Sequence, residues 1–228
     1  MTLKNEIVNI IGAGGHARPV LEVLNENYKK SKKYIYDINF KKKIKKEKIL
    51  GSLVKGSFKD FTAKKFNKAY IAIGDNILRK KIFNILKKNK IQIPNLISKD
   101  ATVSKYLKIG IGNFINRKVF IGAETIIGNN NIINTGSLIE HQVKLGSNSH
   151  VGPSAIIGGH VKIGNNVLIG LGAKIINNVK ICNNCTIGVG SVVTKSINKP
   201  GTYAGIPVWH LMLKRLLPMH GKLIKIML

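Results

Sequence analysis

An aliphatic residue recurs at every sixth position between residues 103 and 193, and this spacing is the strongest constraint on how the chain folds. A period of six fits neither an α-helix, which repeats every 3.6 residues, nor a lone strand, which repeats every two. The chain must therefore turn once per repeat, so that three repeats close a triangular coil of about 18 residues around stacked aliphatic side chains. Gly and Asn are expected at the corners, where positive φ is needed. The repeating residues are Val103, Ile109, Ile115, Ile121, Ile127, Ile133, Ile139, Leu145, Val151, Ile157, Ile163, Ile169, Ile175, Ile181, Ile187 and Val193.

A second, smaller residue follows four positions after most of these aliphatic residues, and it also points inward. The two periodicities together predict a β-helix of hexapeptide repeats. They also bear on the C-x-x-C formed by Cys182 and Cys185, because Cys185 falls on the small inward position and Cys182 on a corner. Core packing is therefore favoured over a redox pair or half of a zinc site.

Length and composition fit one large domain or two modest ones, since the chain has 228 residues and 44% hydrophobic content. No stretch approaches about 18 uninterrupted apolar residues, and Lys4 and Glu6 interrupt the place where a signal core would lie. We therefore expect a cytoplasmic location. The net charge of +28 attracts anions, but no aromatic residues alternate with the lysines between residues 41 and 48, which argues against a nucleic-acid reader.

The N-terminal third reads as part of a nucleotide-binding sheet. Residues 7–11 form an apolar, β-branched run that leads into Gly12-Ala13-Gly14-Gly15-His16-Ala17, and a helical pattern begins at Pro19. Such a glycine turn lets backbone N–H groups and the positive end of a helix approach a phosphate. A second predicted strand, 34–38, places Asp37 where a carboxylate can meet a ribose or a base edge.

A third predicted strand, 69–73, runs into Gly74-Asp75-Asn76, and a helix follows from Ile77. Both loops reach the same carboxyl edge of a small parallel sheet, which is where α/β sheets bind ligands. The segment has room for one mononucleotide half, so we expect a nucleotide sugar or a similar phosphate ester and no NAD chemistry.

Three segments are predicted. They are a Rossmann-like domain over residues 1–97, the β-helix over 98–200, and a basic, apolar tail over 201–228. The tail is expected to cap the open end of the coil, as repeat folds require, with weak contact to an anionic membrane surface as the alternative.

Polar residues other than the usual Gly, Asn and Lys occur together in two successive coils. We expect the catalytic residues among them. His141 lies two residues after an inward Ile, where its imidazole is free to accept a proton. One coil later, at 141 plus 18, stands Gly159, whose N–H is expected to act as an oxyanion donor beside the base. No metal site is predicted, because His141, His150 and His160 occupy different phases of the repeat.

Several of these motifs resemble the bacterial hexapeptide-repeat sugar acetyltransferases, which include sialic-acid O-acetyltransferases and UDP-4-amino-sugar N-acetyltransferases. The likeness runs from residue 7 to about 207. It implies a left-handed parallel β-helix, a homotrimer, acetyl-CoA in the groove between the β-helices of neighbouring chains, and a sugar nucleotide held by the N-terminal domain. The motifs are Gly12-Ala13-Gly14-Gly15-His16, Ile73-Gly74-Asp75-Asn76 with Arg79, Ile133-Asn134-Thr135 and Ile139-Glu140-His141.

The same resemblance implies roles for individual residues. His141 would be the general base, Asn134 and His150 would line the acetyl and acceptor site, and the Gly159 N–H would meet the thioester oxygen. The remaining implied contacts are those to the substrate from Gly12, Gly14, Gly15, His16, Asp37, Gly74 and Asn76, and those to the cofactor from His150, Gly159, Gly170 and Ala173.

Two departures from the family pattern stand out. Gln142 follows the histidine where the family usually has a carboxylate, and the chain closes with Gly205-Ile206-Pro207-Val208-Trp209 instead of Gly-x-Pro-Ala-Lys. The sequence therefore predicts an acetyl-CoA-dependent enzyme that N-acetylates a UDP-linked amino sugar for surface glycans. The alternatives are O-acetylation of a sialic or nonulosonic acid, or a non-catalytic, anion-binding scaffold.

Overall fold

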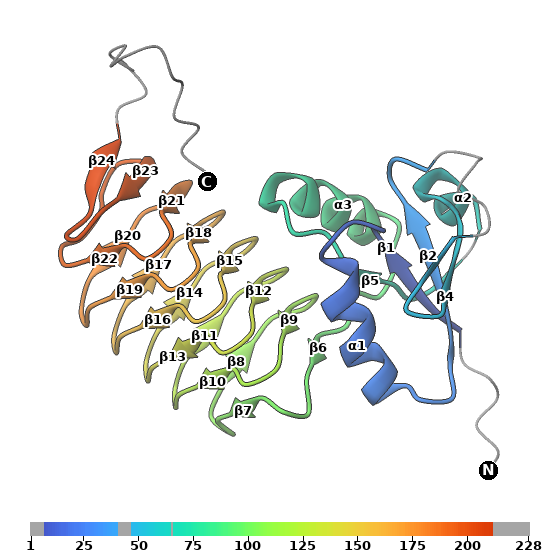
Figure 1. The fold of residues 1–228 in the computed structure, drawn as a ribbon, viewed down its shortest axis with the longest axis horizontal. Coiled ribbons are helices and arrows are strands. Elements are labelled where there is room, and N and C mark those ends of the chain that lie inside the picture. The colour runs from blue at the N-terminus through green and yellow to red at the C-terminus, as the bar shows by residue number, and fades with distance from the viewer. Residues whose placement is uncertain (1–6, 41–46, 65, 212–228) are drawn as a thin grey trace.

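The computed structural model describes residues 7–40, 47–64 and 66–211, which form a small α/β domain followed by a long β-helix (Figure 1). We call the whole β-helix the coil and its 18-residue turns successive coils. The predicted fold class is confirmed. Within the described residues, no helix has both the length and the apolar character needed to cross a membrane.

The N-terminal sheet has the strand order β3-β4-β2-β1-β5, and its neighbouring strands are parallel except where β3 runs antiparallel to β4. The predicted strands and helices are present, whereas β3, β4 and α2 were not anticipated. Because β1 lies between β2 and β5, the loops after β1 and β5 meet at one sheet edge. The elements are β1 (Ile7–Ile11), α1 (Ala17–Asn27), β2 (Lys32–Asp37), β3 (Lys48–Ile49), β4 (Ser52–Ser57), α2 (Phe58–Ala63), β5 (Tyr70–Ile71) and α3 (Asn76–Lys88).

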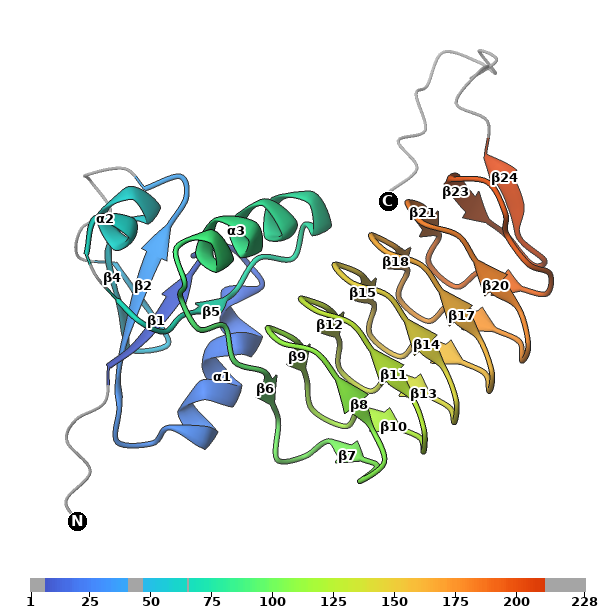
Figure 2. The same ribbon diagram turned by 180° about the vertical axis from the view of Figure 1, so that it is seen from behind.

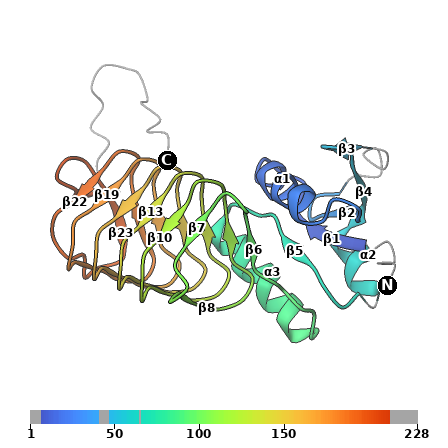
Figure 3. The ribbon, with the colours of Figure 1, turned by 90° about the horizontal axis from the view of Figure 1, so that it is seen from below.

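The coil has three flat faces, each a parallel sheet (Figure 3). We call them face 1 (β7, β10, β13, β16, β19, β22), face 2 (β8, β11, β14, β17, β20) and face 3 (β6, β9, β12, β15, β18, β21, β23, with β24 antiparallel). Their strands are β6 (Leu96–Ile97), β7 (Thr102–Val103), β8 (Lys108–Ile109), β9 (Phe114–Ile115), β10 (Phe120–Ile121), β11 (Ile126–Ile127), β12 (Ile132–Ile133), β13 (Leu138–Ile139), β14 (Lys144–Leu145), β15 (His150–Val151), β16 (Ile156–Ile157), β17 (Lys162–Ile163), β18 (Leu168–Ile169), β19 (Lys174–Ile175), β20 (Lys180–Ile181), β21 (Cys185–Ile187), β22 (Val192–Val193), β23 (Gly201–Ala204) and β24 (Trp209–Leu211).

Successive coils stack at the predicted register of 18 residues, so that Ile121 pairs with Ile139 and Ile139 with Ile157. All sixteen repeating aliphatic residues lie in coil strands and face the core. They are buried except Val103 and Ile109, which lie in the first coil and are partly buried. Cys185 is in this core as expected, and Cys182 is a half-exposed corner residue whose Sγ lies 3.4 Å from that of Cys185.

Positive φ also recurs every six residues, from Gly112 to Gly190, and includes Gln142 (φ +58°) and His160 (φ +61°). Most of these positions are Gly or Asn, as the sequence predicted. The glycines directly after the aliphatic residues are at other positions and have a different cause. A Cβ on Gly122, for example, would lie 2.6 Å from the backbone nitrogen of His141 in the next coil. Those glycines are needed because neighbouring coils approach closely, and not because of φ.

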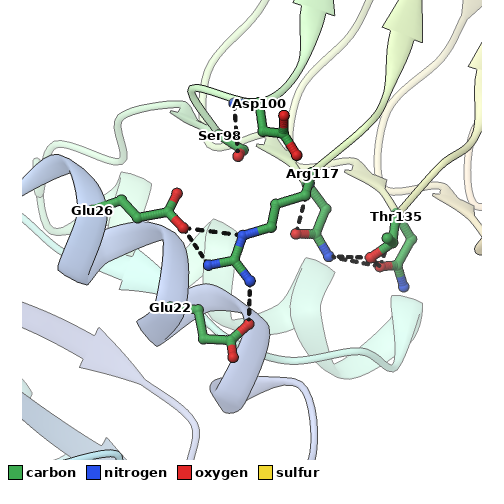
Figure 4. A network of polar contacts seen from close by, with 8 residues as sticks. Glu22, Glu26, Ser98, Asp100, Arg117 and Thr135 are labelled. Carbon is green, nitrogen blue, oxygen red and sulfur yellow. Dashed lines mark hydrogen bonds and ion pairs between the residues drawn. The ribbon is translucent and has the colours of Figure 1, made fainter.

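Two arginines form hydrogen bonds that join the N-terminal domain to the coil. Arg117, on the turn after β9, donates to Glu26 and, at 2.8 Å, to Glu22 of helix α1 (Figure 4). Helix α1 also lies beside β6, as two opposite views show (Figures 1 and 2), and Asn27 donates to the carbonyl of Ile97. β6, at residues 96–97, already pairs with β9 of the coil.

Arg79 of helix α3 is the second of these arginines, and it is buried with only 2% of its surface exposed. Its five N–H groups donate to the side-chain oxygen of Asn76 and to four backbone carbonyls. Two of those carbonyls, of Asn130 and Ser149, belong to the coil. The others belong to Ile73 and Gly74 of the loop after β5, so the guanidinium joins that loop to the coil.

The first part of the predicted tail continues face 3, because β23 pairs with β21 and β24 folds back on β23. This hairpin lies on the last coil (Figure 1). The expected membrane contact falls mainly on residues 212–228, which lie outside the described residues.

Candidate active site

His141 lies on the edge between faces 1 and 2, in the turn from β13 to β14, and we call this the base edge. Its Nδ1 lies 3.2 Å from Oε1 of Gln142. Because an amide oxygen can only accept, this contact requires a proton on Nδ1 and leaves Nε2 free to act as a base. His160, one coil above Gln142, contacts the His141 ring edge-on with centroids 5.1 Å apart.

Gly159 lies against the His141 imidazole, as the sequence predicted. A Cβ on Gly159 would lie 2.9 Å from both Cε1 and Nε2 of the ring, so only glycine leaves room for the imidazole there. The N–H of Gly159 is not free, however. It donates to Oδ1 of Asn177 at 3.0 Å, so the expected oxyanion donor is already hydrogen-bonded.

Asn134 lies on a different edge, between faces 3 and 1, and His150 lies next to it on strand β15 of face 3. We call this edge, together with the neighbouring position of His150, the acceptor edge. Asn116 donates from Nδ2 to Oδ1 of Asn134 at 3.0 Å, which fixes the amide so that its own Nδ2 faces Nε2 of His150 at 3.3 Å. The His16 ring, from the first loop of the N-terminal domain, lies 6.1 Å from that of His150.

Both histidines of the acceptor edge are held neutral. Burial lowers the pKa of His150 to about 4, helped by the positive charge of Arg79 and opposed by a backbone hydrogen bond to Gly74. Burial lowers the pKa of His16 to about 3, helped by His150 and Arg79. Nε2 of His16 is buried and has no hydrogen-bond partner in the part of the chain that the structure describes. Near neutral pH these rings therefore serve as polar, uncharged groups.

The glycine turn after β1 has both structural and open positions. Gly12 has φ +110°, and a Cβ there would lie 2.7 Å from the carbonyl oxygen of Ala72, so this residue is required by the fold. Gly14 and Gly15 are exposed, with open space where a Cβ would stand. Asp37 accepts from the N–H of Ala13 at 3.2 Å. The turn is therefore shaped for close approach by a ligand at Gly14 and Gly15.

The loop after β5 reaches the same place. Gly74 lies beside His16, since a Cβ on Gly74 would be 3.7 Å from the Cβ of His16. Asp75 caps helix α3 by accepting from the N–H of Leu78, and Asn76 donates to the carbonyl of Val167. Between the start of α3 and face 3 is a groove of about 450 Å³, lined by Gly74, Asp75, Asn76, Ile77, His150, Asn166, Leu168, Asn184 and Thr186.

The structure separates residues that the sequence placed in one cluster. His141 and Gly159 are on the base edge, whereas Asn134 is on the edge between faces 3 and 1 and His150 is on face 3 beside it, so face 1 lies between the two groups. Phase within the 18-residue coil, not closeness in sequence, decides which residues meet.

The two other residues expected to contact the cofactor lie differently from one another. Gly170 is on the acceptor edge, where a Cβ would lie 2.6 Å from the backbone carbon of Gly188. The side chain of Ala173 is fully buried in the core, so it cannot contact a cofactor.

Three polar contacts were not anticipated from the sequence. They are the contact of His160 with His141, the support of Asn134 by Asn116, and the bond from Gly159 to Asn177. The spacing could have indicated two of them, because Asn116 precedes Asn134 by 18 residues and Asn177 follows Gly159 by 18. No cluster of three or more His, Cys, Asp or Glu side chains able to hold a metal occurs among the described residues.

Comparison with protein-family models agrees with this architecture. Residues 7–86 match the PglD N-terminal domain, and residues 124–159 and 160–195 match the bacterial transferase hexapeptide (six repeats). The comparison with curated proteins gave no match. A glycine-turn sheet followed by hexapeptide coils with a histidine edge defines an acyltransferase of the hexapeptide class.

Comparison with solved structures narrows the assignment from acyltransferases in general to sugar acetyltransferases. PerB from Caulobacter crescentus, in complex with CoA and GDP-perosamine, is 30% identical, with 93% of this chain and all of that chain covered at a TM-score of 0.83. A perosamine N-acetyltransferase variant from the same organism, with a histidine replaced by asparagine, is 29% identical over 93% and 100% of the two chains (TM-score 0.85). The acetyltransferase domain of PglB from Neisseria gonorrhoeae, with acetyl coenzyme A, is 27% identical over 91% and 100% (TM-score 0.85). The chain belongs to the hexapeptide-repeat sugar acetyltransferase family and is an enzyme.

The lowered pKa values of His16 and His150 predict how stability depends on pH. The unfolded chain takes up protons on these residues near pH 6.5, whereas the folded protein resists until about pH 4 and about pH 3. The contribution of these two histidines to the free energy of unfolding is therefore expected to be full above about pH 6.5. It should fall as the pH drops towards 4. Urea unfolding at pH 7, 6 and 5 would measure the slope.

The matched variants for this prediction are a His16→Gln and His150→Gln double variant, and His160→Gln at an exposed position as the control. The double variant should lose less stability between pH 7 and 5 than the wild type, and the control should keep the wild-type slope. Equal slopes in all three proteins would contradict the prediction.

Proposed function

We propose that the enzyme transfers an acetyl group from acetyl-CoA to the amino group of a UDP-linked amino sugar used for surface glycans. The observation that carries this proposal is the His141 imidazole lying on Gly159, with Nδ1 against Oε1 of Gln142 and Nε2 as the ring nitrogen next to Gly159. The similar PerB and PglB structures, with CoA or acetyl-CoA, support acetyl-CoA as the co-substrate. The proposed location is the cytoplasm.

In the proposed reaction the neutral amine attacks the thioester carbonyl carbon, and Nε2 of His141 takes the proton that the amine loses. The N–H of Gly159 donates to the oxygen that becomes negative in the tetrahedral intermediate. The intermediate then collapses, the C–S bond breaks, and the imidazolium returns the proton to the departing CoA thiolate. No charge is left on the enzyme after a turnover.

The nucleotide sugar is proposed to bind at the shared edge of the N-terminal sheet. Gly14 and Gly15 are open for phosphate oxygens, and Asp37 stands beside the turn. His16, Asn134 and His150 form an uncharged polar group towards which the sugar would extend. The neutral state of both histidines suits a site that holds hydroxyl groups of a sugar.

A second candidate is a GDP-linked amino sugar, because the Caulobacter structures contain GDP-perosamine. Thiol release from acetyl-CoA, measured with a panel of UDP- and GDP-linked amino sugars and with sialic acid, would test the proposal. Turnover with a UDP-linked amino sugar supports it. If sialic acid is the only acceptor that is acetylated, the enzyme is an O-acetyltransferase. If none of the acceptors is acetylated, the scaffold alternative is favoured.

His141→Ala tests the base. Loss of a general base is expected to lower kcat by roughly 10²- to 10⁴-fold with little change in acetyl-CoA affinity. His160→Ala is the matched control, since His160 contacts the His141 ring from the same edge. A loss below about fivefold in His141→Ala would show that the imidazole is not the base.

Gln142→Glu tests the orienting residue. A carboxylate beside the imidazole would stabilise the imidazolium and raise the pKa of the base, so the acidic limb of the kcat/KM profile should move to higher pH. Glu140→Gln is the control, because Glu140 is adjacent to His141 but has no hydrogen bond to its ring in the structure. A shift in Glu140→Gln with an unmoved limb in Gln142→Glu would assign the orienting role to Glu140.

We further propose that the active unit is a homotrimer in which face 1 packs against neighbouring copies. Face 1 carries an outward apolar row, Phe120, Leu138 and Ile156, in register between the two edges. Phe120 and Ile156 are each 39% exposed. A row of this kind marks an interface, and packing on it would bring the base edge of one chain towards the acceptor edge of the next.

The other two faces are less suited to this packing. Face 2 carries Lys144, Lys162 and Lys180 in register, and these like charges would oppose contact with a copy. The outward side chains of Phe114 and Ile132 on face 3 are already buried against the N-terminal domain.

Ile156→Lys is expected to break the trimer and to abolish activity, because a lysine on face 1 would place an unpaired charge in the interface. Ile126→Lys on face 2 is the matched control, since Ile126 is 40% exposed and should tolerate the change. Sedimentation velocity and acetyl-CoA turnover would measure both effects. A wild-type monomer, or a trimeric and active Ile156→Lys variant, would overturn the proposed assembly.

A further inference from the structure

We propose that Asn177 is a positioning residue that holds the N–H of Gly159 in the resting enzyme and must release it before the N–H can meet the thioester oxygen. This inference rests on the proposed function, in which Gly159 supplies the oxyanion donor. It adds a conformational step at a residue outside the motifs that carry the family resemblance.

On the base edge, His141, Gly159 and Asn177 are stacked at the 18-residue spacing. Gly159 contacts the groups of both its neighbours. Its Cα side faces Cε1 and Nε2 of the His141 ring, and its N–H donates to Oδ1 of Asn177 at 3.0 Å. A backbone N–H has one hydrogen, so a thioester oxygen placed beside Nε2 competes with Asn177 for it.

Bonds of the same kind occur on the edge between faces 2 and 3, where no histidine is present in the row. There the N–H of Ser147 donates to Asn165 and the N–H of Asn165 donates to Asn183, both at 2.7 Å. Those bonds join successive turns of the coil. The bond to Asn177 differs because its donor lies directly against the proposed base.

Release of the N–H requires only a side-chain rotation. Asn177 is exposed, so its amide can exchange the bond to Gly159 for water without unpacking the core. The resting enzyme thus keeps its donor satisfied, and acetyl-CoA must displace the Asn177 amide when it binds.

Asn177→Ala tests the inference, with Asn183→Ala as the matched control on the other edge. Removing the competing acceptor is expected to raise kcat/KM for acetyl-CoA by about three- to tenfold, which corresponds to one net hydrogen bond. The pH profile should stay unchanged, because His141 is untouched. Asn183→Ala should leave kcat/KM at the wild-type value while losing similar thermal stability.

Asn177→Asp gives the opposite sign and keeps an acceptor for the turn, so it remains informative if the alanine variant does not fold. A carboxylate binds the N–H more tightly, so kcat/KM should fall, and by more than in Asn183→Asp. An unchanged or lowered kcat/KM in Asn177→Ala would overturn the inference. A lowered value would indicate that the Asn177 amide itself donates a hydrogen bond to the thioester oxygen. Absence of turnover in the wild type with every acceptor would instead refute the proposed function.

Discussion

Parallel stacking of coils at an 18-residue register is the constraint on which the rest of the molecule depends. The strand ladders satisfy most of the backbone and the inward residues fill the core, whereas corner side chains bond to the corners of neighbouring coils. Every corner residue nevertheless lies directly above the residue 18 positions earlier. The register therefore converts sequence spacing into contact, and it places a glycine against His141 and an asparagine amide on that glycine.

The buried guanidinium of Arg79 is the second requirement, because it fixes the N-terminal domain to this rigid coil. A buried charge is costly unless its hydrogen bonds are satisfied, and here four carbonyls and one amide oxygen accept all five N–H groups. Burial lowers the Arg79 pKa only to about 10, so the group stays charged at neutral pH. That charge disfavours protonation of His16 and His150, so the same side chain that orders the loop after β5 also helps to keep the acceptor edge uncharged.

The sequence was sufficient to predict the elements with strong local signals. The six-residue period predicted the coil and its core, and the two glycine loops predicted a shared sheet edge, because parallel strands deliver both loops to one side. β3 and β4 were missed since Lys48–Ile49 and Ser52–Ser57 carry little apolar alternation and follow a lysine run. The composition of the site was also misjudged. Closeness in sequence suggested that Asn134 and His141 share a cluster, whereas the turn at residues 134–137 puts them on different edges.

Gln142 shows how the register shapes chemistry as well as packing. It occupies one of the positive-φ positions of the repeat, and its amide oxygen lies 3.2 Å from Nδ1 of the preceding histidine. A neutral amide there orients the ring but gives an imidazolium no charge support. The carboxylate in the same corner row is Glu124, one coil below, and it shares a cavity of about 300 Å³ with Gln142, Lys144, His160 and Lys162. The lining of this cavity therefore already combines one carboxylate with two lysines beside Gln142, and Gln142→Glu would add a second carboxylate to it.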